Sequence, residues 1–405
     1  MKQTNTSVIP DTWKRFLKMY ICFSVFSVFM NNFITTFMLR STGDDTSMTM
    51  LYNIILAAVQ PFAMVAAVHL IRKKTALFSQ CVGLGLFTCM FLILMVLGEN
   101  AVKYYYLLGA VFACGNGFFF VTYALQLQAY TRDINRDKCY GLQNIVGNVI
   151  GLCLPILTGL LLKICTDFTG YTIMFAMGLI ASMGSIWFTL HLHPITEISP
   201  RPELGKALKV LIHNKYASAA MLTSTANGFY DGIMLFFLPM LMFRINHNES
   251  ITGFYTAACA LAALAASFVY GKTITPARRA PSVALSLGLM ILLTVVLAFI
   301  PESANRIYIA ALFVYGVVLK LLSTFFVTPP LMSYFKVVER LPDLHGLAGE
   351  VHTLREFWYG TGRVLGILMA MLLMTFSIPN AVIILVVLLV QLVPAVLMKR
   401  MEEVC

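Results

Sequence analysis

Residues 199–215, SPRPELGKALKVLIHNK, lie in the longest connection between the apolar runs of this chain and divide those runs into two sets. The 405 residues are 59% apolar and 12% charged, and their mean hydropathy is +0.81. Six apolar runs of about 20 residues precede the connection and six follow it, and each run can span a bilayer as a helix. The sequence therefore predicts an all-α membrane protein with twelve transmembrane helices in two six-helix, pseudo-symmetric bundles.

The predicted organisation has an N-terminal bundle at 1–192, a linker at 193–216 and a C-terminal bundle at 217–405. The polar N-terminus is not a cleavable signal, because the apolar run after it is too long and lacks a small-residue cleavage site. The expected spans, in chain order, are 17–39, 49–71, 76–98, 104–129, 141–163, 171–192, 217–243, 252–271, 281–300, 307–329, 347–374 and 378–398.

Within the linker, Leu204, Leu208 and Leu211 follow helical spacing, while lysines occupy other positions of the turn. This pattern suits an amphipathic helix that lies on the inner surface of the membrane. A solvated linker explains the same composition, and the sequence alone does not separate the two.

Basic and acidic residues alternate from loop to loop. Loops after even-numbered spans carry clusters such as Arg72, Lys73 and Lys74, whereas loops after odd-numbered spans carry acids such as Asp44 and Asp45. The positive-inside rule therefore places both termini in the cytoplasm of a multi-pass plasma-membrane protein. The same alternation argues against nucleic acid as the partner of a chain with a net charge of +11. The short loops are typical of a bacterial protein.

The sequence contains few motifs for metal, disulfide or nucleotide binding. The nine cysteines are scattered without a CxxC pair, which predicts buried apolar residues or reduced thiols and neither a disulfide nor a metal site. The sequence contains no P-loop, so transport driven by ATP is not expected from this chain. We therefore expect no cofactor and no enzymatic activity.

The two halves repeat each other at a nearly constant offset. FITTFMLRSTGDDTS ends the first span, and LPMLMFRINHNES ends the seventh. Matches at one offset, together with matching topology, predict a duplicated six-helix unit. The matched pairs are Arg40 and Arg244, Lys74 and Arg278, and Tyr130 and Tyr334, each 204 positions apart, with Gly141 and Gly346 at 205.

Twelve spans, a six-plus-six repeat, cytoplasmic termini and a long central loop make the whole chain similar to the major facilitator superfamily. The family carries a motif between its second and third helices. Here this region reads AAVHLIRKKTAL at 66–77, and its second-half counterpart reads GKTITPARRA at 271–280. In the family an acid of the motif helps to hold the closed state, and both copies here lack that acid. The resemblance implies a gating role for the remaining basic residues, Arg72, Lys73, Lys74, Arg278 and Arg279.

The fifth span carries Gly147, Gly151, Pro155 and Gly159 at four-residue spacing. This run is similar to a Gly/Pro motif of family exporters of the antiporter type. Small residues at this spacing also let helices pack closely in any transporter. The resemblance favours efflux over uptake, and ordinary helix packing is the alternative.

Charged residues in the eleventh span indicate a transport site. One face of this predicted helix is polar. Its members lie within a sector of roughly a third of the helix circumference: His352, Arg355, Glu356, Tyr359 and Arg363. Arg363 lies about 16 residues into the helix, or roughly 24 Å at 1.5 Å per residue. A charge at that depth usually lines a cavity, pairs with another charge or binds substrate. Arg363, Tyr359 and Glu356 are therefore predicted to bind substrate, and an Arg363 ion pair that serves only folding or gating is the alternative.

The seventh span holds a second polar face, made of Ser224, Asn227 and Asp231. Asp231 lies about 14 residues from the inner end, or roughly 21 Å deep. A carboxylate in hydrocarbon favours its protonated form unless a cation lies beside it. Asp231 is thus predicted to carry the coupling proton, with Asn227 near the substrate. A permanent ion pair with Arg363 or Lys320 is the alternative.

Lys320 in the tenth span is a further predicted substrate contact, whereas the first half offers amides and no charge at mid-membrane depth. Two cations and one anion leave a surplus of about +1, which favours a carboxylate or phosphate group on the substrate. A neutral Lys320 would remove that surplus. Aromatic residues could hold an apolar part of the substrate, although they more often pack helices. The first-half residues predicted to bind substrate are Asn31, Asn32, Asn116, Tyr123 and Gln126.

These features predict a secondary transporter that works by alternating access about a midplane site. We expect proton-coupled export of an amphipathic organic compound that carries an anionic group. Proton-driven uptake of an organic anion and lipid flipping are alternatives, and a receptor or scaffold that moves nothing is disfavoured. The expected partners are a small-molecule or lipid-like substrate, protons and membrane lipids. One chain holds a complete pathway, so a monomer should suffice.

Overall fold

The computed structural model describes residues 9–30, 46–164, 169–195, 203–234, 237–246, 249–301, 305–376 and 378–404, and these ranges contain helices and no strand. The first-half helices are α1 (Asp11–Val28), α3 (Thr46–Lys73), α4 (Ala76–Leu97), α5 (Tyr105–Tyr130), α6 (Asp133–Ile164) and α7 (Thr169–Leu190). The second-half helices are α9 (Lys215–Met234), α10 (Phe237–Asn246), α11 (Glu249–Thr273), α12 (Arg279–Ala298), α13 (Asn305–Arg340), α14 (Ala348–Thr375), α15 (Asn380–Val390) and α16 (Leu392–Glu402).

Every predicted span has a helical counterpart in the described parts of the chain. Within those parts, nine helices are long and apolar enough to cross a membrane: α3, α4, α5, α7, α11, α12, α13, α14 and the α15–α16 pair. Helices α1 and α6 and the α9–α10 pair occupy the positions of the other three predicted spans. The prediction of an all-α membrane protein is confirmed.

The tenth span is predicted to end at 329, but α13 continues through Pro329 and Pro330 to Arg340. A proline inside a helix removes the backbone donor that would bond the carbonyl four residues earlier. Here Ser282 of α12 donates to the Phe325 carbonyl oxygen at 3.0 Å and replaces that donor. A neighbouring helix therefore supplies the hydrogen bond that lets α13 run on.

The last span is predicted as one helix, but it is divided at Gln391 into α15 and α16. Pro394 lacks the N–H group that would bond the Val390 carbonyl oxygen, so the helix is interrupted there. The Gln391 side chain donates to the Ala226 carbonyl oxygen of α9 at 2.7 Å. This bond fixes the junction of α15 and α16 against α9.

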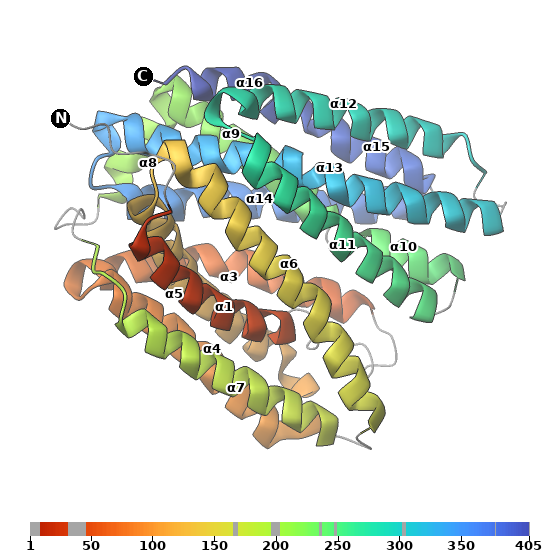
Figure 1. Ribbon diagram of the computed structural model, residues 1–405, viewed down its shortest axis with the longest axis horizontal. Coiled ribbons are helices and arrows are strands. Elements are labelled where there is room, and N and C mark those ends of the chain that lie inside the picture. The colour runs from red at the N-terminus through yellow and green to blue at the C-terminus, as the bar shows by residue number, and fades with distance from the viewer. Residues whose placement is uncertain are drawn as a thin grey trace.

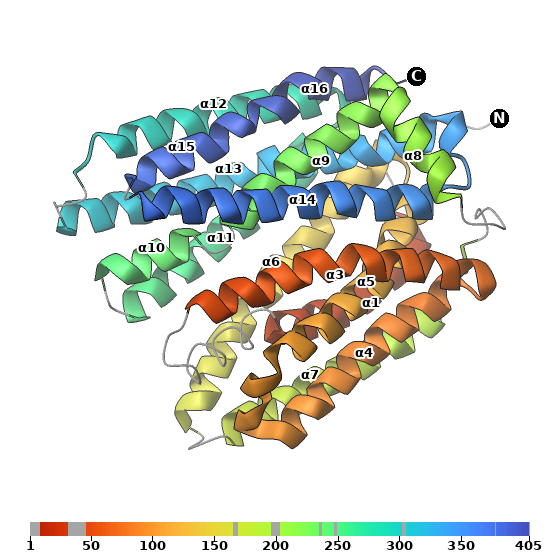
Figure 2. The same ribbon diagram turned by 180° about the vertical axis from the view of Figure 1, so that it is seen from behind.

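Figures 1 and 2 show the first-half helices on one side of the molecule and the second-half helices on the other, with both termini at the same end. We call this the terminal end. Across the boundary, α3 contacts α14 and α6 contacts α11. These two pairs are the second with the eleventh span and the fifth with the eighth, so the repeat predicted from the sequence relates them.

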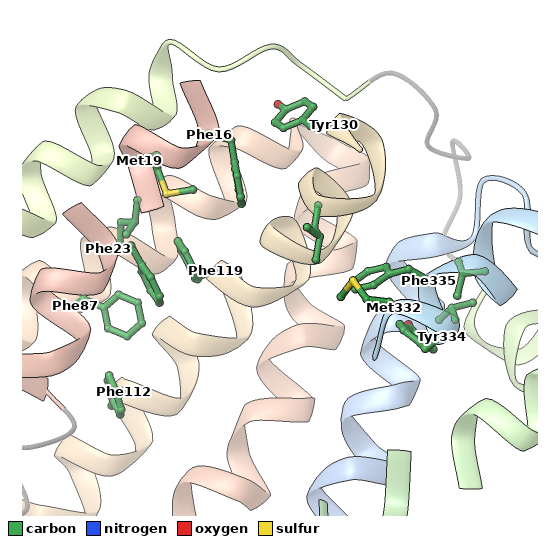
Figure 3. Packing of buried hydrophobic residues seen from close by; sticks show 14 of the residues in the cluster. Phe16, Met19, Phe23, Phe87, Phe112, Phe119, Tyr130, Met332, Tyr334 and Phe335 are labelled. Atoms are coloured by element: carbon green, nitrogen blue, oxygen red, sulfur yellow. The ribbon is translucent and has the colours of Figure 1, made fainter. Parts of the chain in front are cut away.

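A buried cluster joins the two halves at the terminal end. Phe16, Phe23 and Phe119 belong to it from the first half, and Tyr334 and Phe335 of α13 belong to it from the second (Figure 3). The Phe23 and Phe119 rings stack with their centres 4.0 Å apart. Packing of this kind, rather than the hydrophobic effect, holds helices together inside a bilayer.

The central connection contains a helix, α8 (Leu204–His213), which contacts α9 and α14. Ala207 and Leu211 are buried against the protein, while Leu208 and Ile212 are exposed. The position of α8 on a membrane surface stays a prediction.

Candidate substrate and proton site

Helices α9 and α14 approach each other backbone to backbone, and this contact positions the predicted site residues. A Cβ atom added at Gly232 would lie 2.6 Å from the Arg363 carbonyl oxygen, and one added at Gly366 would lie 2.5 Å from the Phe229 carbonyl oxygen. Glycine permits this approach because it has no side chain to block it. Asp231, the neighbour of Gly232, is thereby placed against α14.

Asp231 accepts two hydrogen bonds from α14. Arg363 Nη2 donates to Asp231 Oδ2 at 3.0 Å, and the Tyr359 hydroxyl donates to the same oxygen at 2.8 Å. The Arg363 guanidinium carbon also lies 4.6 Å from the centre of the Tyr359 ring. The side chains of Asp231 and Arg363 are each 32% exposed. The carboxylate therefore lies next to a cation, yet both partners stay accessible.

The polar face of α14 continues from this pair toward the terminal end. Glu356 accepts a hydrogen bond from Gln60 Nε2 of α3 at 3.0 Å, which joins the two halves. His352 is buried, and its Nδ1 atom lies 2.5 Å from the Tyr334 hydroxyl oxygen of α13. The predicted stripe thus runs from the buried terminal end to the accessible pair at Asp231.

Arg355 lies on the same face without an acid partner. Its Nε donates to Ser224 Oγ of α9 at 3.1 Å. Its guanidinium carbon lies 4.8 Å from the centre of the Tyr334 ring and 5.3 Å from that of Tyr359. Among the residues that the structure describes, no carboxylate oxygen comes within 4.0 Å of its nitrogens. Arg355 is thus fixed by neutral groups alone.

The charges of this cluster cancel when all its members are ionised. Arg355 and Arg363 supply two positive charges, and Asp231 and Glu356 supply two negative ones. The sequence predicts a surplus of one positive charge, because it counts Lys320 in place of Arg355 and leaves out Glu356. In the structure, Lys320 makes no ion pair with a described residue.

Several tyrosines of the first half lie near one another or near the charged residues. Tyr140 of α6 lies within Coulombic range of both Arg355 and Asp231. The ring centre of Tyr123 of α5 lies 6.2 Å from that of Tyr20 of α1. Substrate contact by Tyr123 stays a prediction, as does the predicted asymmetry between a charged second-half side and an uncharged first-half side.

Two predicted substrate contacts have other surroundings. Gln126 is fully buried between α5 and α4, where it and Gln80 bond each other reciprocally at 2.7 and 3.1 Å. Lys320 is exposed on α13, with Cys259 of α11 in Coulombic range. Among the described residues, neither makes a hydrogen bond or ion pair with Asp231 or Arg363: Gln126 bonds within its own bundle, and Lys320 forms no ion pair with a described acid.

The remaining predicted substrate contacts are four asparagines. Asn227 is buried one turn from Asp231, and its Oδ1 atom has no hydrogen-bond partner among the described atoms. Asn116 is half-buried on α5. Asn31 and Asn32 lie outside the described residues.

Sequence reasoning missed Tyr140 and Gln143 of α6 as site residues. Gln143 Nε2 donates to the Tyr123 hydroxyl, so it helps to hold that side chain. A signal was available, because Tyr140, Gln143 and Gly147 recur at helical spacing along the fifth span. Tyr334 was singled out only as the repeat partner of Tyr130, and no local pattern indicates that its ring lies over Arg355.

Ion pairs join the two halves at the terminal end, and two of them use the predicted gating residues. Arg72 Nη2 of α3 donates to Glu350 Oε1 of α14 at 2.5 Å. Arg279 Nη2 of α12 donates to Asp137 Oδ2 of α6 at 2.6 Å, and its Nη1 donates to Asp133 Oδ1 at 2.8 Å. Both arginines therefore pair with acids on facing helices of the other half, and their gating role stays a prediction.

A third pair between the halves joins Arg136 of α6 to Glu339 of α13 at 2.7 Å. The Tyr270 hydroxyl of α11 also donates to Asp137 Oδ1 at 2.6 Å. The other predicted gating residues, Lys73, Lys74 and Arg278, are exposed. The basic motifs therefore divide into buried arginines that bond across the boundary and exposed cations that face solvent.

The described residues include no group of three His, Cys, Asp or Glu side chains placed to hold a metal ion. The cluster brings together a carboxylate and two guanidinium groups, and guanidinium groups bind anions through paired, charge-assisted hydrogen bonds.

The chain has relatives and structural neighbours among bacterial proteins. It is 22% identical over 343 residues to the uncharacterized protein YqgE of Bacillus subtilis, a match that covers 85% of this chain and 78% of YqgE. A crystal structure of a bacterial homologue of the iron transporter ferroportin in an outward-facing state superposes with a TM-score of 0.73 at 11% identity, covering 97% of this chain and 99% of that one.

A crystal structure of a variant of the E. coli fucose:proton symporter FucP superposes with a TM-score of 0.71 at 9% identity, covering 96% of this chain and 98% of that one. At such identities these likenesses show the fold alone. The sequence profile of the Major Facilitator Superfamily matches residues 7–340. The chain, a multi-pass membrane protein with the transporter fold, therefore belongs to the major facilitator superfamily.

Proposed function

We propose that this protein is a secondary transporter that moves a small organic anion together with a proton by alternating access. The observation that carries the proposal is the accessible contact of Asp231 with Arg363 and Tyr359, at the middle of the α9–α10 pair and of α14. Charged groups at that depth are costly in a bilayer and are typical of proton and substrate pathways. A pair that served only to hold the helices together would not need a third of each side chain exposed.

The positive-inside rule supports a cytoplasmic location for the terminal end. The pairs Arg72–Glu350, Arg136–Glu339 and Arg279–Asp137 then close the cytoplasmic side. Transport requires that these contacts break while others form at the opposite end.

The signs of the charges favour cotransport. A proton on Asp231 removes the negative charge that holds Arg363, and Arg363 is then free to bind an anion. An anion on Arg363 in turn displaces Asp231 and favours its protonation. Each ligand thus promotes the binding of the other, which is the coupling that a cotransporter needs. A cationic substrate would compete with the proton, as in an exchanger.

Export in exchange for protons, the direction favoured by the Gly/Pro run of α6, is the second candidate. In this conformation a Cβ added at Gly151 would meet no heavy atom within 4 Å, and one at Gly147 would meet the Tyr20 hydroxyl at 3.2 Å. At Gly151, therefore, no described helix packs closely against α6 in this conformation. That observation supports a role in the movement of α6, and movement serves either direction.

The test begins with a thermal-shift screen of the purified protein against organic anions, lipophilic cations and lipids, each at acid and neutral pH. The best ligand then enters a transport assay in liposomes with an imposed pH gradient. Asp231→Asn should still bind and exchange the ligand but should not accumulate it, because the side chain can no longer take a proton. Asp11→Asn, at an exposed acid of α1, should transport like wild type.

Accumulation by Asp231→Asn at the wild-type level would remove Asp231 from the coupling step. Stabilisation by cations alone would overturn the anion assignment and favour export. Stabilisation by lipids alone would favour lipid flipping.

A further inference from the structure

Two arginines of α14 differ in how their charge is balanced. The charge of Arg363 is balanced by Asp231, which bonds it at 3.0 Å. Arg355, eight residues earlier on the same face, bonds only the Ser224 hydroxyl. A cation in this position without a described acid partner is costly unless an anion visits it. Without ligand, Arg363 is thus paired with a carboxylate, whereas Arg355 is available to bind an anion.

Arg355 keeps its terminal nitrogens available. Its guanidinium lies near two tyrosine rings, with ring centres 4.8 and 5.3 Å away, and its Nε is used by Ser224. The terminal nitrogens make no hydrogen bond to a described residue, and neither is among the buried atoms that lack a partner. They are therefore accessible. A guanidinium held in this way presents two parallel donors, the arrangement that binds a carboxylate in bidentate fashion.

Two aromatic rings, those of Tyr334 and Tyr359, lie beside the guanidinium of Arg355. Tyr334 is buried, whereas Tyr359 is partly exposed and can contact the rest of a ligand. Flat rings favour a flat aromatic ligand through offset or edge-to-face contacts.

The charge balance sets the number of negative charges on the ligand. Arg355, Arg363, Asp231 and Glu356 sum to zero when all are ionised. When Asp231 takes a proton, the sum becomes about +1, which one anionic group would neutralise. A monoanion bound with one proton leaves the site neutral and lets it cross the bilayer without an uncompensated charge.

We propose that Arg355 is the primary anion-binding residue and that the transported ligand is a planar aromatic monoanion of the aromatic carboxylate class. This inference rests on the proposed function, which it makes specific. The carboxylate binds the terminal nitrogens of Arg355, the ring lies against the ring of Tyr359, and Arg363 joins the anion once Asp231 is protonated.

The test uses the purified full-length protein and three matched probes: benzoate, cyclohexanecarboxylate, which lacks the aromatic ring, and benzamide, which lacks the charge. Binding is measured by calorimetry and by thermal shift at acid and neutral pH. Wild type should bind benzoate about three- to tenfold more tightly than cyclohexanecarboxylate, the range expected for one aromatic contact. It should not bind benzamide measurably.

Arg355→Gln should bind benzoate at least about tenfold more weakly, because a hydrogen bond to a charged group is lost. Arg355→Lys should recover only part of the affinity, since a lysine lacks the planar pair of donors. Arg306→Gln, at an exposed arginine of α13, is the control and should bind like wild type. Melting curves without ligand and size-exclusion profiles establish that each variant is folded. If Arg355→Gln cannot be purified, the benzoate affinity of Arg355→Lys is used in its place to test the role of Arg355.

Unchanged benzoate affinity in Arg355→Gln would overturn the role of Arg355. If only Arg355→Lys can be purified, unchanged affinity in that variant would do the same. Equal affinity of wild type for benzoate and cyclohexanecarboxylate would overturn the aromatic class, as would no binding of benzoate. These results leave the proposed function intact if another anion shows proton-driven accumulation that Asp231→Asn abolishes. Unimpaired accumulation in Asp231→Asn would instead defeat the proposed function, whatever Arg355→Gln does.

Discussion

Tyr359 lies beside three charged side chains of the site. Its hydroxyl donates to Asp231 at 2.8 Å, and its ring lies within 4.6 and 5.3 Å of the guanidiniums of Arg363 and Arg355. The hydroxyl stabilises the ionised carboxylate, and the ring gives both cations an electron-rich neighbour. Removing only the hydroxyl therefore separates these two contributions.

Tyr359→Phe should raise the pH at which proton-coupled transport is half-maximal by about one to two units. The variant deprives the ionised Asp231 of a hydrogen bond worth roughly 1.5–3 kcal/mol, and the protonated form then persists to higher pH. The measurement is the pH profile of transport in liposomes. Tyr334→Phe, which loses a hydroxyl that contacts His352 and not Asp231, is the control. Coincident profiles for Tyr359→Phe and wild type would show that this hydroxyl does not influence the coupling group.

At the scale of elements, the contact of α9 with α14 depends on glycines at facing positions. A Cβ added at Gly228 would collide with the Tyr359 carbonyl oxygen, and one added at Gly362 would collide with the Thr225 carbonyl oxygen. Both atoms belong to helix backbones, which cannot move aside as a flexible side chain can. The two helices therefore have to part before any side chain fits between them.

Gly228→Ala should lower stability by about 1–3 kcal/mol, the usual cost of overpacking a tight contact, and should weaken ligand binding by moving Asp231 away from Arg363. Thermal unfolding in detergent and calorimetry with the best ligand provide the measurement. Gly288→Ala on α12 is the matched control, since its Cβ would meet nothing within 4 Å. Equal melting temperatures for Gly228→Ala and the control would mean that the helices tolerate separation at this point.

Elements and local periodicity were predictable from the sequence, whereas partners across helices were not. The twelve apolar runs and the polar face of α14 depend on spacing within one segment, so they can be read without the fold. The choice of Arg363 over Lys320 as partner of Asp231 depends on how α9, α13 and α14 are rotated. Likewise, two amides 46 residues apart, Gln80 and Gln126, pair with each other, and neither segment alone indicates it.

At the scale of the whole molecule, the two halves are joined at the terminal end by arginines that reach into the opposite half. The side chains of Arg72 and Glu350 are 3% and 0% exposed, and that of Arg279 is fully buried. Burying such a pair gives little net stability, but removing one partner leaves an uncompensated charge that costs about 3–5 kcal/mol. Loss of one arginine thus destabilises this arrangement of the halves much more than loss of an exposed cation.

Arg279→Gln should therefore shift the population toward conformations in which the terminal end is open. Spin labels at Lys74→Cys, directly after α3, and at Arg340→Cys, at the end of α13, should report a longer distance in this variant, in a background without other reactive cysteines. Arg278→Gln removes the neighbouring exposed arginine and should leave the distance distribution as in wild type. Identical distributions for the two variants would show that Arg279 does not hold the halves together.

The glycine contact between α9 and α14 has a consequence for how the ligand leaves. Because these two helices approach backbone to backbone at their glycines, we expect Asp231, Arg355, Tyr359 and Arg363 to move as one unit in the proposed rocking of the halves. For a given protonation state of Asp231, this unit contacts a ligand in the same way whichever side of the membrane it faces. Beyond the proton itself, any difference between loading and unloading must then come from the first-half residues opposite the unit. At a fixed pH, a substitution at Tyr140 is therefore expected to change the release rate while leaving the charged contacts intact.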